Sequence, residues 1–327
     1  MLIIRRNTTD PFFNLAAEEY ILKNFDEDTF ALWRNSKSII VGKHQNTLAE
    51  VNQDYVNRNN IKVVRRLSGG GAVFHDLGNL NFTFTQTSRD ENLINFRKYT
   101  QPILDVLQQM GVNALFEGRN DLTINGKKFS GNAMHIWKNK ILHHGTLLFS
   151  AEIPDLSAAL NADPSKFEDK AVKSVRSRVT NIREHLKEEI DVIQFADRIE
   201  QFIMEKNPDA TLYELSHEDM DQIRKLCDSK YATWEWNFGY SPKYNFRKVM
   251  RTTRSGTIEI NLDVHDGVIQ KVKFFGDYFG ILDSEEIEKA LVGVDHRHEP
   301  VRQVINSFDL SKYFANLSPE ELFPGFF

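Results

Sequence analysis

The chain has 327 residues, 41% of them hydrophobic, so it is long enough for two domains with real cores. Its formal net charge of −5 argues against general affinity for nucleic acid, and any anion site must be local. No run approaches the ~20 apolar residues of a membrane span. The single cysteine, Cys227, excludes a disulfide framework and a cysteine-rich metal site. The N-terminal residues read as a short strand and not as a signal peptide, so we expect a soluble, cytosolic protein.

The first 60 residues predict short strands and two helices. Asp10 and Pro11 are typical of an N-cap and a first helical position. Apolar residues then recur at the three-and-four spacing of one helix face, at Phe13, Ala16, Ala17, Tyr20 and Ile21. Strands are predicted at 29–33 and 38–41, and a short amphipathic helix is predicted around Leu48, Val51 and Tyr55.

Residues 61–84 carry the most informative pattern in the chain. A strand ends in Arg65 and Arg66, and Ser68 is followed by three glycines before β-type residues resume. Glycines let the backbone turn sharply and approach a ligand, and their N–H groups can point at an anion. Neither G-x-x-x-x-G-K-[ST] nor a G-x-G-x-x-G that opens a helix is present. We therefore predict a strand–loop–strand anion cradle, with a plain tight hairpin turn as the alternative.

Helices and a hairpin are predicted farther along the chain. A long helix is expected at about 95–110, and Asn125-Gly126 predicts the turn of a hairpin. A strand follows at 141–149. Residues 164–181 are crowded with lysine and arginine and predict a mobile basic loop. Two helices are expected at about 190–206 and 217–228.

The chain changes character after about residue 246. Three strands joined by Ser255-Gly256 and Asp266-Gly267 predict an antiparallel meander, and short helices are expected near 284–292 and 300–307. We therefore predict a first domain at 1–245 and a small α+β domain at 246–327.

Several polar residues of the first domain are candidates for chemistry. Lys128 follows Lys127 after the Asn-Gly turn, and by themselves the two favour the interpretation as solvated turn lysines. Asp121 could bind Mg²⁺, since phosphate-associated magnesium sites use one or two carboxylates, or it could cap the turn. His143 and His144 have no cysteine or histidine partner at ligand spacing, so we expect them to form hydrogen bonds and not to hold a metal.

Six segments, in the same order, resemble lipoate–protein ligase A of the biotin/lipoyl ligase superfamily. The first is Arg65-Arg-Leu-Ser-Gly-Gly-Gly-Ala-Val-Phe-His-Asp-Leu-Gly-Asn79, in which Leu67 replaces a residue that is often arginine. The others are Gly118-Arg-Asn-Asp-Leu122, Lys128-Phe-Ser-Gly-Asn-Ala133, His143-His-Gly-Thr-Leu-Leu148, Ser174-Val-Arg-Ser-Arg-Val-Thr-Asn181 and Trp234-Glu-Trp-Asn-Phe-Gly239. The resemblance covers the whole chain, including the C-terminal accessory domain.

The resemblance implies an α+β fold, with a biotin/lipoyl-ligase-like mixed sheet flanked by helices and a small α+β accessory domain. It implies that lipoate and ATP form lipoyl-AMP and pyrophosphate with Mg²⁺. The lipoyl group then passes to a lysine of an acceptor lipoyl domain, in a dehydrogenase-complex E2 or a glycine-cleavage H protein. A monomer without nucleic-acid or membrane partners is expected. The choice of acceptor and the preference between lipoate and octanoate stay open.

The resemblance also assigns roles to particular residues. Lys128 is implied as the catalytic residue, between the lipoate carboxyl and the α-phosphate, in contact with both lipoate and ATP. The basic loop is implied to close over the adenylate. Contacts to ATP or adenylate are implied at Arg66, Gly71, Ala72, Val73 and Phe74. Contacts to lipoate are implied at Ser68, Gly69, Gly70, His75, His144 and Gly145.

Three other functions fit the sequence less well. An octanoyl or lipoyl transferase of the same superfold works through a cysteine thioester, but the chain has no cysteine before Cys227. A biotin ligase would carry a differently spaced glycine and arginine loop. A catalytically dead lipoyl-binding or regulatory protein is disfavoured because Arg66 and Lys128 are both present.

Overall fold

The computed structural model describes the chain as two compact units. The described residues are 1–45, 47–51, 53–87, 94–153, 159–160, 179–233, 235–239, 246–252, 255–265, 268–296 and 298–326. The first unit comprises Met1–Val41, Leu48–Arg65 and Ala72–Asn237. The second comprises Gly42–Thr47, Arg66–Gly71 and Phe238–Phe327. The predicted basic loop at 164–181 lies almost entirely outside the described residues.

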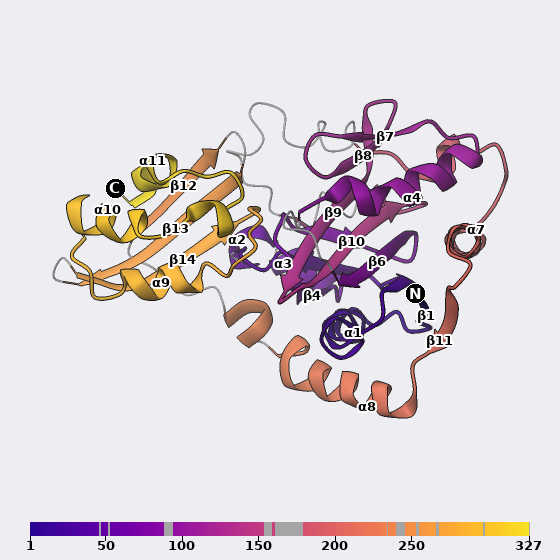
Figure 1. Cartoon of the computed structure of the whole chain (residues 1–327), viewed down its shortest axis with the longest axis horizontal. Coiled ribbons are helices and arrows are strands. Elements are labelled where there is room, and N and C mark those ends of the chain that lie inside the picture. The colour runs from indigo at the N-terminus through magenta and orange to yellow at the C-terminus, as the bar shows by residue number, and fades with distance from the viewer. Residues whose placement is uncertain are drawn as a thin grey trace. The chain divides into compact units, whose positions relative to one another are not determined.

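An eight-stranded mixed sheet forms the centre of the first unit, in the order β11-β1-β2-β6-β10-β9-β8-β7. Its first three strands, β11, β1 and β2, run parallel, and the later neighbours pair antiparallel. The strand bounds are β1 Leu2–Arg5, β2 Thr29–Trp33, β6 Asn79–Thr87, β7 Ala114–Glu117, β8 Asp121–Ile124, β9 Lys127–Trp137, β10 Lys140–Leu148 and β11 Thr211–Glu214. The mixed sheet flanked by helices that the resemblance implies is therefore present (Figure 1).

Neighbouring side chains on the central strands point to opposite faces of this sheet. Thr83 and His144 contact Glu18 of helix α1 (Pro11–Asn24), whereas Phe84 and His143 contact Tyr99 of helix α4 (Phe96–Gln109). The two helices therefore cover opposite faces, and α7 (Val192–Lys206) packs beside α4. This arrangement separates a polar network under α1 from an aromatic core under α4.

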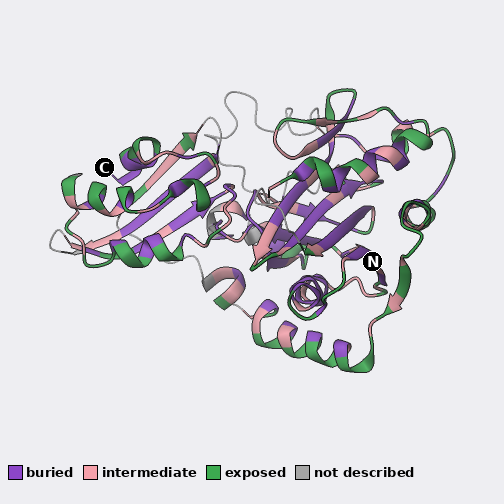
Figure 2. Cartoon of the chain, in the orientation of Figure 1, coloured by how far each residue is buried: buried purple, intermediate pink, exposed green. Residues whose placement is uncertain are grey.

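Helix α1 begins as predicted, with Asp10 as its N-cap accepting a hydrogen bond from the backbone N–H of Phe12. Burial extends beyond the apolar face that the spacing predicted. The helix is buried almost all round, including Asn14, Glu18 and Glu19 (Figure 2). The reason is that α8 (His217–Leu226) and the π-helix η3 (Cys227–Tyr231) cover the side that faces away from the sheet.

A second sheet of three short strands carries the glycine-rich stretch. Strand β3 (Ser38–Val41) lies between β4 (Lys62–Arg65) and β5 (Val73–His75), parallel to β4 and antiparallel to β5. The predicted strand–loop–strand order is therefore confirmed. The two strands that flank the glycines do not pair with each other, so the alternative of a tight hairpin turn is wrong.

The remaining helices of the first unit are short. Two helices, α2 (Thr47–Glu50) and α3 (Gln53–Arg58), stand where one amphipathic helix was predicted around Leu48, Val51 and Tyr55. Val51, which lies between them, forms an isolated bridge with Leu160. Two further short segments among the described residues are η2 (Ile182–His185), in the first unit, and η4 (Glu235–Gly239), which crosses from the first unit into the second. No helix among the described residues is long and apolar enough to cross a membrane.

The second unit contains the predicted antiparallel meander. Its strands are β12 (Phe246–Thr252), β13 (Gly256–His265) and β14 (Val268–Gly276), with β13 in the middle. The helical segments are α9 (Glu285–Leu291), α10 (His298–Asn306), η5 (Leu310–Lys312), α11 (Pro319–Leu322) and η6 (Phe323–Phe326). Together they bury a separate core that includes Ile260, Phe274, Tyr278 and Phe314.

Candidate active site

Lys128 and Asp121, the predicted catalytic residue and metal ligand, form an ion pair. The Nζ atom of Lys128 lies 2.7 Å from Oδ1 of Asp121, and the two side chains are 42% and 39% exposed. They come from opposite strands of the β8–β9 hairpin, whose turn residues Asn125 and Gly126 both have positive φ, 52° and 72°. A β-bulge between Leu122 and Thr123 shifts the register of these strands. The lysine therefore has a carboxylate partner at a partly open site.

Two further contacts place Lys128. The N–H of Thr180 donates to the backbone carbonyl of Lys128 at 3.0 Å, and Val179 forms an isolated parallel β-bridge with Lys128. A Cβ atom on Gly131 would lie 3.1 Å from Nζ, so the lysine chain lies directly over this glycine. The absence of a side chain at Gly131 thus leaves the space that the lysine occupies.

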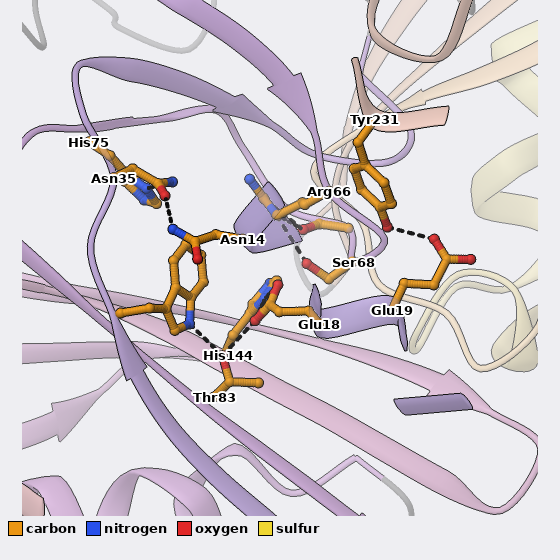
Figure 3. A network of polar contacts seen from close by, with 12 residues as sticks. Asn14, Glu18, Glu19, Asn35, Arg66, Ser68, His75, Thr83, His144 and Tyr231 are labelled. Atoms are coloured by element: carbon orange, nitrogen blue, oxygen red, sulfur yellow. Dashed lines mark hydrogen bonds and ion pairs between the residues drawn. The ribbon is translucent and has the colours of Figure 1, made fainter. Parts of the chain in front are cut away.

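His144 belongs to a buried polar network under α1 (Figure 3). Its Nδ1 atom lies 3.0 Å from Oε2 of Glu18, and both residues are almost fully buried. Thr83 donates to Oε1 of the same carboxylate at 2.5 Å and accepts from the indole N–H of Trp33 at 2.8 Å. Burial opposes ionisation of Glu18, but His144, Arg6 and the Thr83 hydroxyl outweigh it and lower the pKa of this carboxyl.

Gly145 must lack a side chain in this fold. A Cβ atom there would lie 2.2 Å from Oδ1 of Asn132 and 2.5 Å from the Phe82 ring. His143, two residues before Gly145 on the strand, lies on the same face of the sheet and stacks on Tyr99, with ring centroids 5.1 Å apart. Burial, with the neighbouring His144 charge, keeps the pKa of His143 well below its usual value. The expectation that both histidines form hydrogen bonds is confirmed, since His143 Nε2 lies 3.2 Å from Oδ1 of Asn132.

The predicted residues of β5 lie in the same unit. His75 is buried, and its Nδ1 atom lies 3.1 Å from the side-chain amide of Asn35, which accepts a hydrogen bond from Asn14. Phe74 is a core residue, 3% exposed, whereas Ala72 and Val73 are half-buried. The first unit thus holds eight of the predicted residues, namely Ala72, Val73, Phe74, His75, Asp121, Lys128, His144 and Gly145.

The other predicted residues, Arg66, Ser68, Gly69, Gly70 and Gly71, belong to the second unit. Arg66 is buried and donates to Oγ of Ser68 at 3.0 Å. It also donates to the carbonyls of Gly69 and Gly71, at 2.7 and 2.8 Å. Gly70 has φ +93°, a backbone conformation that residues with a side chain rarely adopt. In this structure the arginine therefore holds the loop's own backbone.

Sequence reasoning missed Glu18, Trp33 and Thr83. A signal was present, because Asn14, Glu18 and Glu19 are polar residues set among the apolar residues of the first three turns of this helix. Buried polar groups need partners, so three of them on one apolar helix point to a network. Its members could not be paired without knowing the sheet order.

The donor set fits a restricted kind of metal site. Among the described residues, no three His, Cys, Asp or Glu side chains gather as a metal cage would require. A single carboxylate such as Asp121 fits Mg²⁺ that is held mainly by phosphate oxygens.

Two family models match the chain over most of its length. The Lipoyl protein ligase A/B catalytic domain matches residues 10–204, and the Bacterial lipoate protein ligase C-terminus matches residues 241–324. The chain is 44% identical to lipoate–protein ligase 1 of Staphylococcus aureus over 322 residues, which is 98% of each protein.

Solved structures agree with the sequence matches. The chain is similar to LipL1 of P. falciparum in complex with lipoate, with TM-score 0.80, 28% identity and 94% of each chain covered. A lipoate–protein ligase A bound with ATP gives TM-score 0.63 at 28% identity, over 73% of this chain and 98% of that one. With both family models matched in order and a relative this similar over its full length, the chain belongs to the lipoate–protein ligase family.

Proposed function

We propose that the chain joins lipoate to a lysine of an acceptor lipoyl domain in two ATP-driven steps, with Lys128 as its central cation. The two-step reaction is the general reaction of the family. The observation that carries the residue assignment is the half-exposed Lys128, set over Gly131 and paired with Asp121.

In the first step the lipoate carboxylate attacks the α-phosphorus of ATP. The new bond is a mixed anhydride, and the bond to the β-phosphate oxygen breaks, so pyrophosphate leaves with its electron pair. Both reactants are anions and repel each other. A fixed cation between them lowers this repulsion and stabilises the charge that builds on the α-phosphate. An ammonium group is a compact charge that can touch both oxygens, and Lys128 supplies one.

In the second step the neutral amine of the acceptor lysine attacks the acyl carbon of lipoyl-AMP. An amide forms, AMP leaves and the amine loses a proton. The activated acyl group is already on the nucleotide, so no enzyme thioester is needed. Cys227 suits this scheme, because it is buried and burial raises the pKa of its thiol to about 11. Such a thiol is a poor nucleophile at neutral pH, which argues against the transferase alternative.

The acyl chain of lipoate is proposed to lie along β10, beside His144 and Gly145. The buried Glu18–His144 pair supplies placed polar groups of the kind that small-molecule sites use. Gly145 is proposed to take part through its backbone, because Asn132 and Phe82 fill the space where a side chain would lie. Ser68, Gly69, Gly70 and His75 are proposed as further lipoate contacts. Arg66, Gly71, Ala72, Val73 and Phe74 are proposed on the ATP side. Phe74 can take part there only through its backbone, because its side chain is in the core.

Mg²⁺ is proposed to be held by the nucleotide phosphates and Asp121. When bound, it would neutralise phosphate charge and favour the departure of pyrophosphate. Acceptors are proposed to be lipoyl domains, of the dehydrogenase-complex E2 type or the glycine-cleavage H protein. We further propose a cytosolic monomer, organised as a catalytic domain at 1–245 and an accessory domain at 246–327.

The proposed function is tested by incubating the protein with ATP, Mg²⁺, an apo lipoyl domain and either lipoate, octanoate or biotin. Mass spectrometry of the lipoyl domain is expected to show one lipoyl group on one lysine, with pyrophosphate released. Modification without ATP would instead indicate a transferase. No modification with any acid would refute the proposal.

A further inference from the structure

The glycine loop Arg66–Gly71 packs within the second unit against the segment Gly276–Asp283, which begins at the last residue of strand β14. A Cβ atom on Gly69 would lie 2.3 Å from the backbone oxygen of Tyr278. A Cβ atom on Gly70 would lie 3.6 Å from the Phe279 ring. The two backbones meet so closely at Gly69 that no side chain fits between them.

The loop Gly42–Thr47 forms hydrogen bonds with both the glycine loop and the segment Gly276–Asp283. The N–H of Lys43 donates to the carbonyl of Ser68 at 2.8 Å, and the N–H of Gly276 donates to the carbonyl of His44 at 2.6 Å. The His44 ring stacks on Tyr278, with centroids 4.6 Å apart and an interplanar angle of 21°. The loop therefore bonds to the glycine loop on one side and to the C-terminal segment on the other.

A charge pair completes the contact. The ammonium of Lys43 binds the carboxylate of Asp283, whose Oδ1 atom also accepts the N–H of Glu285 at 3.0 Å. Burial opposes ionisation of Asp283, but Lys43 outweighs it and lowers the pKa of this carboxyl to about 2. Tyr278 is fully buried in the core of the unit and packs on Phe314 at 4.8 Å. The C-terminal segment is therefore anchored in a packed core.

We infer that Gly276–Asp283 is a positioning segment for the lipoate-binding glycine loop, acting through Tyr278 and the Lys43–Asp283 pair. The segment lies outside the 10–204 range that matches the catalytic family model. The inference rests on the proposed function, which gives the glycine loop its ligand.

The physical reason is the entropy of glycine. Three consecutive glycines lose more conformational freedom on ordering than other residues do, so a ligand that ordered them would bind weakly. Arg66 holds the loop through hydrogen bonds to the carbonyls of Gly69 and Gly71, and the backbone of Gly276–Asp283 packs against it. A loop held in shape before binding lowers the ordering cost, and this cost appears in the affinity for lipoate. Saturating lipoate orders the loop in any case, so the maximal rate is expected to change little.

The test uses the full-length protein and the variants Asp283→Asn, Lys43→Gln, their double variant and the charge swap Lys43→Asp/Asp283→Lys. Glu285→Gln is the matched control. Glu285 lies two residues after Asp283, and its ion pair is an exposed one with Lys289. Hydrogen exchange at the amides of residues 66–71 is measured without substrates. The KM for lipoate and kcat are then measured by pyrophosphate release, and thermal unfolding is recorded for every variant.

A partly exposed ion pair supports an effect of about two- to five-fold. Asp283→Asn is therefore expected to speed loop exchange and raise the KM for lipoate by that factor, with kcat and thermal unfolding nearly unchanged. The double variant should resemble each single one, the charge swap should restore KM, and Glu285→Gln should match wild type. An unchanged KM in Asp283→Asn, or a KM that rises equally in Glu285→Gln, overturns the inference.

The two proposals fail in different ways. Wild-type protein that releases no pyrophosphate with lipoate would overturn the proposed function, and the lipoate part of this inference with it. Active wild-type protein with an Asp283→Asn variant of equal KM would overturn the positioning role and leave the function intact.

Discussion

Replacing Lys128 with alanine is expected to remove catalysis while leaving the fold nearly intact. The Lys128–Asp121 ion pair is about 40% exposed on both sides, and pairs of this kind contribute about 0–1 kcal/mol to stability. Loss of a cation that stabilises transition-state charge costs roughly 10²–10³ in rate, or about 3–4 kcal/mol. The loss in rate should therefore far exceed the loss in stability.

Lys128→Arg is expected not to restore the rate. The lysine ammonium lies so close over Gly131 that a single Cβ atom there would be 3.1 Å from it. A planar guanidinium is larger and fixed in shape, so it cannot take the same position between two oxygens.

The assay is lipoate-dependent pyrophosphate release, with thermal unfolding measured on the same samples. Lys127→Ala is the matched control, because Lys127 is an exposed lysine next to Lys128 on the same hairpin. Lys127→Ala should keep its activity, and both alanine variants should unfold within a few degrees of wild type. Pyrophosphate release by Lys128→Ala within a few-fold of wild type would refute the catalytic role.

Four other changes have defined outcomes. Asp121→Asn should raise the Mg²⁺ concentration needed for half-maximal activity, and an unchanged requirement would rule out its role as a metal ligand. Gly70→Val should weaken lipoate binding in calorimetry and lower the unfolding temperature, because a β-branched residue is strained at φ +93°; normal binding of lipoyl-AMP would contradict its placement. Gly145→Ala should destabilise the protein by about 1–3 kcal/mol in denaturant unfolding, because its Cβ would overlap the Phe82 ring. Burial opposes ionisation of Glu19, but Lys230 and its other partners lower its pKa from 4.5 to about 2. This depressed pKa contributes about 3 kcal/mol to the free energy of unfolding above pH 4.5, and the contribution is lost as the pH falls toward 2. The stability deficit of Glu19→Gln should therefore shrink between pH 5 and 2, and a constant deficit would contradict the assignment.

The sequence by itself determined those features that depend on neighbouring residues. The helix start at Asp10-Pro11, the Asn125-Gly126 turn and the β12–β14 meander all follow from local backbone preferences, and each is present. The order of six motif segments was enough to indicate the family, because that information also lies along the chain.

Only the tertiary structure decided which distant residues meet. Strand β11 was not predicted, because its partner β1 is about 200 residues away and no local pattern marks a parallel edge. The Lys128–Asp121 pair depends on the register of β8 and β9, which a β-bulge shifts. The Glu18–His144 pair depends on α1 covering one face of the sheet. The unit to which the glycine loop belongs was likewise decided by packing on Tyr278, far from it in sequence. Residue preferences act over a few positions, whereas these contacts arise from strand register and close packing across the whole fold.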